Sequence, residues 1–283
     1  MGLLQLLNGL SLAALLFVVA SGFTLIFGLL RIVNLAHGSI YLFGGYVGYA
    51  VGAWYGSFAL ACVAGFFSVV ILGLLLDQCL LRFVRGSDLR QVLLTLGVTF
   101  VLNDLMLVIW GGDTFNVKVP ALLQGATTFG SITFPKFRYF VIGLGVVVFI
   151  ALWLMLNKTK LGCLIRAGVD DVEMVEAVGI PIRKIFLFTF LLGCGLAGLG
   201  GVVGGAFLTL YPSADSEILV FSLAIVIIGG RGSLLGAAVG SILVGLLSTT
   251  GMVMFPELAY FVLFAPMALI LAFRPQGILG KSV

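Results

Sequence analysis

Long apolar runs, separated by short polar interruptions, dominate the chain. Residues 12–30 contain no charged side chain at all. A helix needs about 20 mainly apolar residues to cross a bilayer. We expect helices over 8–30, 39–55, 58–81, 91–110, 138–157, 185–207, 217–229, 234–250 and 258–273. Because 39–55 and 217–229 are short or broken by glycine, the pattern predicts eight or nine membrane crossings.

The composition agrees with this pattern. The 283 residues are 61% hydrophobic and 9% charged, with a mean hydropathy of +1.27. Soluble domains carry about 25% charged residues, so this chain lacks the polar surface of a water-facing globule. We therefore predict an all-α, polytopic membrane protein with a single transmembrane domain over residues 1–283. The first residues lack a charged segment and a clear cleavage site, and we expect a retained first helix.

The basic residues indicate how the chain is oriented. One set of alternate loops carries Arg31, Arg82, Arg85, Arg90, Lys158, Lys160, Arg166, Arg183, Lys184, Arg231, Arg274 and Lys281, and the other carries Lys118, Lys136 and Arg138. Under the positive-inside rule this asymmetry places the N-terminus outside and the C-terminus in the cytosol. The net charge of +4 is then a signal of topology, and we expect no nucleic-acid partner.

Two hydrophilic interruptions are long enough to form structure outside the membrane. Residues 111–138 mix turn-forming and β-branched residues, and we expect them to form an external loop. Residues 157–184 form the longest charged segment, and we expect them in the cytosol.

Within the cytosolic segment, Val172, Val175 and Val178 recur at helical spacing, which predicts a short amphipathic helix. Such a helix is marginally stable alone in water. It either rests on its own membrane domain or docks into a groove on a cytosolic partner. The candidate docking residues are the acids of this segment and the glycine that ends its helix: Asp170, Asp171, Glu173, Glu176 and Gly179.

Polar side chains inside apolar spans usually face a cavity or a pathway. Thr95, Thr99 and Asn103 are four residues apart and share one helix face, with Asp104 beside it. For the threonines two interpretations stay open, namely hydrogen bonds between helices and the lining of a substrate pathway. For Asn103 and Asp104 we favour the pathway, because an amide and a carboxylate are harder to bury.

The stretch "RIVNLAHGSIYLFGGYVG" begins at residue 31 and contains the only histidine. We interpret it as a structural break between the first two spans. His37 either stabilises the broken helix or, with Asn34 and Ser39, contacts the substrate pathway. A lone histidine without Cys, Asp or Glu neighbours is a poor ligand set, so we expect no metal site.

A second stretch, "RGSLLGAAVG" from Arg231, repeats the order basic residue, Gly, Ser and glycine-punctuated apolar residues. Paired glycine-interrupted segments in the two halves of a transporter indicate the translocation pathway. Close helix packing is the alternative. The positions expected to break helices or pack them closely are Gly38, Gly230, Gly232 and Gly236.

Two sequence motifs for nucleotides fail on their context. "GCGLAG" matches a dinucleotide fingerprint but lies inside an apolar span, and "PQGILGKS" lacks the first glycine of a phosphate loop. Neither HExxH, GxSxG nor a Cys/His cluster occurs. We expect a protein that is not an enzyme and needs no cofactor.

The chain resembles the permeases of the branched-chain (hydrophobic) amino acid ABC transporter family over essentially its whole length. The "NLAHG" block, "RAGVDDVEMVEAVGIPIRK", "GGRGSLLGA" and the terminal "FRPQGILG" carry the resemblance. It implies a permease subunit of the cell inner membrane without its own ATPase. It also implies a second homologous permease in a heterodimer, two cytosolic ATP-binding subunits and an external solute-binding protein. Residues 170–179 would then form the coupling helix, although "EAVG" only approximates the family's EAA-then-Gly pattern.

The expected function is ATP-driven import of branched-chain or other hydrophobic amino acids. One alternative inside the family is the import of urea or short amides. Another is an ion-coupled secondary transporter, which would need carboxylates deep in its spans, where Asp104 is the best candidate.

Overall fold

The computed structural model describes residues 2–30, 32–84, 86–129, 132–254, 256–274 and 276–280. Arg31, Arg85 and Lys281 of the basic set lie outside the described residues. Most of the described chain is α-helical, which confirms the predicted class. The α-helices are α1 (Leu3–Phe23), α2 (His37–Tyr55), α3 (Phe58–Cys79), α4 (Asp88–Trp110), α5 (Lys136–Lys158), α6 (Lys160–Asp170), α7 (Val172–Ala177), α8 (Ile182–Phe207), α9 (Ala214–Gly229), α10 (Leu234–Met254) and α11 (Ala259–Phe273).

The remaining elements are short. A π-helix, η1 (Thr24–Leu29), continues α1. The 3-10 turns are η2 (Leu81–Phe83), η3 (Ala121–Leu123) and η4 (Pro256–Leu258), and the antiparallel strands are β1 (Ala126–Phe129) and β2 (Ile132–Pro135).

Each of the nine apolar segments expected from the sequence forms a helix, but fewer meet the requirements for a membrane span. Six described helices are long and apolar enough to cross a bilayer, compared with the eight or nine expected. The difference lies in α2, α9 and α11. The last two have 16 and 15 residues, and α2 is rich in glycine. These three helices therefore need the rest of the bundle to hold them at membrane depth.

Helices α1 and α8 form the centre of the bundle. Helix α1 packs on α5, α8, α9 and α10, and α8 also packs on α2 and α3. By contrast, most residues of α3, α4 and α5 remain accessible, and many of them are large and apolar, such as Phe67, Phe100 and Val147. A surface of this kind is suited to lipid or to another membrane subunit.

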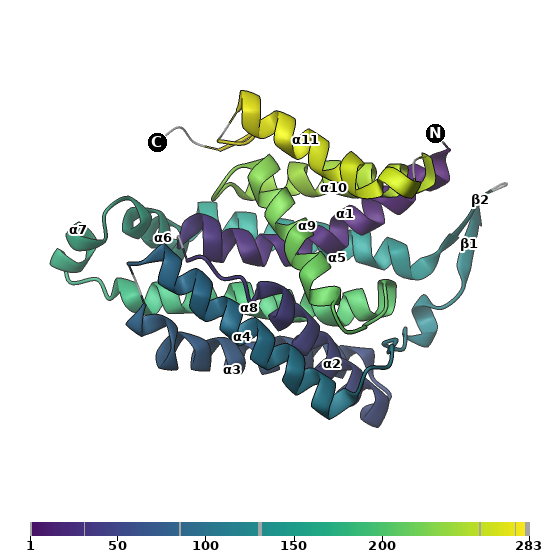
Figure 1. Cartoon of the computed structure of the whole chain (residues 1–283), viewed down its shortest axis with the longest axis horizontal. Helices are drawn as coiled ribbons and strands as arrows, with labels where there is room; N and C mark the ends of the chain where they lie inside the picture. Colours follow the sequence, from purple (N-terminus) through teal and green to yellow (C-terminus); the bar gives the residue numbers. More distant parts are fainter. Residues whose placement is uncertain are drawn as a thin grey trace.

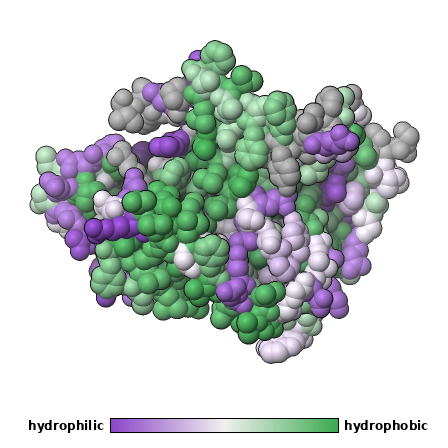
Figure 2. Space-filling view, viewed as in Figure 1, coloured by the Kyte–Doolittle hydropathy of each residue, from purple (hydrophilic) through white to green (hydrophobic). Residues whose placement is uncertain are grey.

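The molecule has an apolar middle and two polar ends. Helix α7 lies at one end of the long axis and the β1–β2 hairpin at the other, with the start of α1 on the hairpin side (Figure 1). Figure 2 shows hydrophobic residues across the middle and hydrophilic residues gathered towards both ends. This distribution is what a bilayer requires of a protein that spans it.

After η1 the chain turns back into the bundle before α2 begins. The Nε2 atom of His37, the first residue of α2, lies 3.1 Å from the carbonyl oxygen of Val19. Val19 precedes the end of η1 by ten residues, a distance of about 15 Å along a helix. Helix α2 therefore starts beside the C-terminal part of α1, about 15 Å back from the end of η1.

Helix α9 also begins inside the bundle. Its first turn meets the start of α2, where a Cβ on Gly38 would lie 2.0 Å from the carbonyl oxygen of Asp215. Sixteen residues rise only about 24 Å, less than the roughly 30 Å of a hydrocarbon layer. The preceding turn contains two non-glycine residues with positive φ, Thr209 (91°) and Ser213 (78°). Such conformations cost about 1–3 kcal/mol each and persist only where packing enforces them.

The charged segment between α5 and α8 forms a helical hairpin of α6 and α7. The side chain of Asp171 accepts a hydrogen bond from the Met174 amide at the start of α7. At its end, the amides of Gly179 and Ile180 bond to the carbonyls of Glu176 and Val175, and Gly179 has φ of +84°. These two bonds form a Schellman motif, for which a glycine at this position is the usual solution.

The apolar stripe expected on this helix is only partly buried. Val175 is buried against α6 and α8, whereas Val172 and Val178 are 41% and 72% exposed. The helix has six residues, so it presents a single buried position to its own domain. The predicted short helix is confirmed, and it rests on its own domain through Val175. Val178 remains exposed beside the acidic side chains.

At the opposite end, the segment from Gly111 to β2 covers the end of α8. Phe115 and Leu210 form an isolated antiparallel bridge, and the Val117 amide donates to the Gly205 carbonyl at 3.1 Å. Val117 is buried in this contact. The expected mixture of turn and β-branched residues thus forms a short hairpin and an extended strap.

Close packing of α8 on α2 provides a test of this fold. A Cβ on Gly201 would lie 2.0 Å from the Tyr41 carbonyl oxygen, whereas a Cβ on Gly143 of α5 would meet nothing within 4 Å. We expect Gly201→Val to destabilise the protein by about 1–3 kcal/mol or more, because the backbone cannot yield as a side chain does. Thermal unfolding of the detergent-purified protein measures this effect. Gly143→Val is the matched control, and equal losses in the two variants would contradict the packing described.

Candidate functional site

One face of α4 borders the chain segment between η1 and α2. Its polar side chains are spaced by four residues, and they are Gln91, Thr95, Thr99 and Asn103. The Oε1 atom of Gln91 accepts a hydrogen bond from the Val33 amide at 3.1 Å. The Oγ1 atom of Thr95 accepts one from the Leu35 amide, also at 3.1 Å. Side chains of α4 thus take the place of the backbone partners that a continuous helix would provide.

The spacing of the two partners explains this pairing. Four residues of a helix rise about 6.0 Å, and two residues of extended chain advance about 6.6 Å. Alternate residues of the segment, Val33 and Leu35, therefore meet successive side chains of the α4 face. In a membrane, irregular backbone is tolerated only where protein satisfies its polar groups, and α4 does so here.

The two threonines take part in hydrogen bonds with backbone. Thr95 donates to the carbonyl of Gln91 at 2.7 Å, which leaves its oxygen free to accept from Leu35. Thr99 donates to the carbonyl of Thr95 at 3.0 Å and lies 3.5 Å from the carbonyl of Leu35. This geometry favours the interpretation as hydrogen bonds between segments over a lining of the pathway.

Asn34 and His37 are buried at the same break. The Oδ1 atom of Asn34 accepts a hydrogen bond from the Ala36 amide at 3.1 Å, an arrangement that tightens the turn before α2. The Nε2 atom of His37 donates to Val19, because a carbonyl can only accept. Asn34 Nδ2 and His37 Nδ1 have no partner among the described residues. Both side chains stabilise the break, and each keeps one unused polar atom.

Ser39, Asn103 and Asp215 form a buried polar cluster where α2, α4 and α9 meet. Asp215 is 3% exposed. Its Oδ2 atom accepts hydrogen bonds from Ser39 Oγ at 3.0 Å and from Asn103 Nδ2 at 2.9 Å. The Oδ1 atoms of Asp215 and Asn103 have no partner in the described part of the chain. Three elements distant in sequence thus place one carboxylate inside the bundle.

The charge of this carboxylate is only partly balanced. Asp215 lies in the first turn of α9 and contacts the first turn of α2 through Ser39. The N-terminal ends of helices carry partial positive charge and favour an anion. Within the described residues, no Lys or Arg lies within salt-bridge distance of Asp215. A buried ion without a counter-ion is costly, and in membrane proteins such residues mark functional sites.

The structure separates Asp104 from the acids that are buried in the bundle. Asp104, named as a pathway candidate, is exposed, whereas Asn103 joins the Asp215 cluster. From the sequence, Asp104 is the best candidate for a carboxylate deep in the spans. Its exposure shows that this expectation is wrong. Asp77 and Asp215 are the buried ones, at 5% and 3% exposure.

Neither Asp215 nor Gln91 was among the residues predicted from the sequence. Gln91 continues the four-residue spacing of the α4 face by one step towards the N-terminus, so the spacing alone could have identified it. Asp215 stands in "PSADSEILV", an acid immediately before an apolar run, which resembles an ordinary helix start at a membrane surface. Only the fold shows that this helix starts inside the bundle.

The glycines named from the sequence lie at two separate places. Gly38 touches the backbone of Asp215, as described above. Gly230 and Gly232 have φ of +101° and +75° and form the turn between α9 and α10. A Cβ on Gly236 would lie 2.2 Å from the carbonyl oxygen of Gly229. The two similar stretches thus make different contacts. Residues 37–39 pack against the start of α9.

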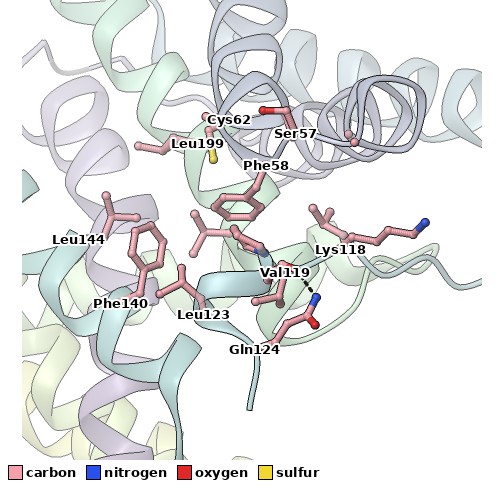
Figure 3. Close-up of a pocket in the computed structure, with 18 residues that line it drawn as sticks. Ser57, Phe58, Cys62, Lys118, Val119, Leu123, Gln124, Phe140, Leu144 and Leu199 are labelled. Atoms are coloured by element: carbon pink, nitrogen blue, oxygen red, sulfur yellow. Dashed lines mark hydrogen bonds between the residues drawn. The ribbon is translucent and has the colours of Figure 1, made fainter. Parts of the chain in front are cut away.

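A cavity of about 780 Å³ lies elsewhere, between α3, α5, α8 and residues 117–124. Figure 3 shows Phe58, Phe140 and Leu199 along its walls. Lys118 and Gln124 belong to the segment of residues 117–124 on another side. No residue of α4 or α9 lines it, so it is distinct from the Asp215 cluster. The described residues contain no group of three or more His, Cys, Asp or Glu side chains placed to hold a metal ion.

Thr95→Val tests the role of α4 at the break. The substitution keeps the shape of the side chain but leaves the Leu35 amide without its acceptor. An unsatisfied buried donor costs about 1–3 kcal/mol, so we expect a lower midpoint of thermal unfolding. Thr250→Val is the control, because the Thr250 hydroxyl bonds only within α10, to the Leu246 carbonyl. A loss in the control as large as that in Thr95→Val would show that the break does not depend on this bond.

Comparison with known proteins places the chain in a family. The family model described as branched-chain amino acid transport system / permease component matches residues 5–271. The high-affinity branched-chain amino acid transport system permease protein BraD of Pseudomonas aeruginosa is 28% identical over 98% of this chain and 95% of its own length. LivH of Escherichia coli, with the same description, is 26% identical over the same shares.

A solved structure supports the fold alone. PsaBC from Streptococcus pneumoniae superposes with a TM-score of 0.51 at 15% identity, covering 94% of this chain and 89% of that one. The fold, the apolar spans and the match over nearly the whole length agree, and the chain belongs to the family of branched-chain amino acid transport system permease components.

Proposed function

We propose that the chain is the membrane-spanning permease subunit of an ATP-driven importer of branched-chain or other hydrophobic amino acids. The family match over residues 5–271 carries this proposal. The relatives described as branched-chain amino acid permeases cover nearly the whole chain. In this assignment the ATPase activity belongs to partner subunits.

The proposed complex contains a second homologous permease, two cytosolic ATP-binding subunits and an external solute-binding protein. It resides in the cell inner membrane. The α7 end would face the cytosol, because the exposed cations of this end satisfy the positive-inside rule, and they include Lys158, Lys160, Arg166, Arg183 and Lys184. The β1–β2 hairpin and the N-terminus would then face the solute-binding protein.

Helix α7 is the proposed docking element for an ATP-binding subunit. Its outward side carries Met174 and Val178, which are 64% and 72% exposed, together with the acids predicted to make contact. On its inward side, Val175 packs with Ile165 of α6 and Ile182 of α8, and Leu29 of η1 joins the same group. A movement of α7 would therefore reach α8 and the end of α1 directly.

That path leads to the helix break. The end of η1 continues into the segment held by α4, and this segment leads to the start of α2 and the Asp215 cluster. Closure of the ATP-binding subunits would thus act on the two helices that begin inside the bundle. Alternation between outward-open and inward-open forms is the expected result.

Two alternatives remain as outcomes of experiment. In the first alternative, the chain is a permease of the same family that imports urea or short amides. An ion-coupled transporter would use a buried carboxylate, and Asp215 is the residue that favours this second candidate.

Uptake by the reconstituted complex tests the proposal. We expect ATP-dependent accumulation of radiolabelled leucine, isoleucine and valine when the partner permease, the ATP-binding subunits and the solute-binding protein are present. Urea and acetamide should not accumulate. Uptake by the chain alone, driven by an ion gradient without ATP, would instead establish the secondary transporter.

Glu176→Arg tests the docking role of α7. The side chain is 43% exposed and pairs with Arg183 at 3.5 Å on the surface, a contact that contributes little to stability. We expect uptake to fall about tenfold while the protein level in the membrane is unchanged, because reversing a charge at an interface repels the partner. Asp113→Arg, an equal reversal at the opposite end, is the control for docking and should co-purify with the ATP-binding subunits as the wild type does, whereas Glu176→Arg should co-purify with less of them. Unchanged transport in Glu176→Arg would contradict the docking role.

A further inference from the structure

We propose that Asp215, Asn103 and Ser39 form a binding site for the ammonium group of the transported amino acid, inside the membrane-spanning bundle. The proposal rests on the proposed function, since it takes an amino acid as the substrate. It assigns recognition of the amine to the permease itself, in addition to any recognition by a solute-binding protein.

The cluster offers acceptors that its own donors leave unused. Both donors of the cluster bond to Asp215 Oδ2, whereas Asp215 Oδ1 and Asn103 Oδ1 accept from no described residue. Ser39 Oγ donates its proton and keeps lone pairs to accept with. An ammonium group has three N–H donors, and these three oxygens match it in number.

The charges at the cluster favour the same ligand. Asp215 is more than nine-tenths buried, and no described Lys or Arg pairs with it. An arriving ammonium would supply the missing counter-ion, and the low dielectric of the site would strengthen the attraction. A carboxylate at the same place would be repelled by Asp215, which already occupies the position that the two helix N-termini favour.

The amino acid would therefore enter with its amine directed to Asp215 and its carboxylate elsewhere. The structure shows the site closed, and it also indicates where the site opens. Helix α4 packs on α2 and α9 packs on α2, but α4 and α9 make little contact with each other. The Asn103–Asp215 hydrogen bond is what joins them. Separation of α9 from α4 would expose the unpaired oxygens without unpacking the core around α1 and α8.

Equilibrium binding to the permease–ATPase complex in nanodiscs, without the solute-binding protein, tests this site. The probes are radiolabelled leucine and two competitors, 3-methylbutylamine, which keeps the amine, and 4-methyl-2-oxopentanoate, which keeps the carboxylate. We expect the wild-type complex to bind leucine, the amine to displace it and the keto acid to have no effect. In Asp215→Asn, leucine binding should weaken about 30-fold or more, because one partner of a buried charge pair is removed.

Controls separate this site from a structural role. Asp113→Asn removes an exposed carboxylate and should bind leucine as the wild type does. Co-purification of the ATP-binding subunits with Asp215→Asn reports assembly, and we expect the same yield as for the wild type. If Asp215→Asn fails to assemble, Asn103→Ala provides the second variant. Its competition by 3-methylbutylamine should weaken while its ATP-binding subunits co-purify as they do with the wild type.

The outcomes also separate this inference from the proposed function. If the wild-type complex imports leucine but binds none without the solute-binding protein, or if the keto acid competes as well as the amine, the site does not recognise the ammonium group and the proposed function stands. Unchanged leucine binding in Asp215→Asn overturns the inference in the same way. If the wild-type complex imports no amino acid at all, the proposed function fails and this inference fails with it.

Discussion

Backbone amides and carbonyls inside a membrane must find partners within the protein, and the rest of this structure depends on how the chain meets that requirement after η1. A continuous helix would have met it automatically. Here the chain leaves the helix, and side chains of α4 accept the amides of Val33 and Leu35 instead. This substitution permits α2 to begin at the level of Val19, and the same level is where α9 begins. Without the polar face of α4, neither helix start could be held there.

The sequence alone was sufficient to predict the helices and part of the candidate site. Apolar length decides whether a segment forms a helix in lipid, and each of the nine segments does so. Four-residue spacing placed Thr95, Thr99 and Asn103 on one face, which is a local property of a helix. It could not separate Asn103 from Asp104, because successive residues differ by 100° and only the neighbouring helices decide which is buried.

The rest of the site depends on contacts between distant residues. Asp215 is 112 positions from Asn103 and 176 from Ser39, so no local pattern connects them. Its position also depends on the turn at Thr209 and Ser213, which adopts positive φ without glycine and is therefore hard to anticipate. Which side of α7 is buried depends on distant contacts in the same way. A helix of six residues has room for one buried position, and the tertiary packing selected Val175.

The pairing of alternate residues with α4 has a consequence for the length of the break. The amides of Val33 and Leu35 donate to α4, whereas those of Ile32 and Ala36 bond to Ile26 and Asn34. Removal or insertion of one residue would turn the amides of Val33 and Leu35 away from Gln91 and Thr95. A change of two residues would restore their direction. The alternation of these amides thus couples the length of the break to the spacing of the acceptors on α4.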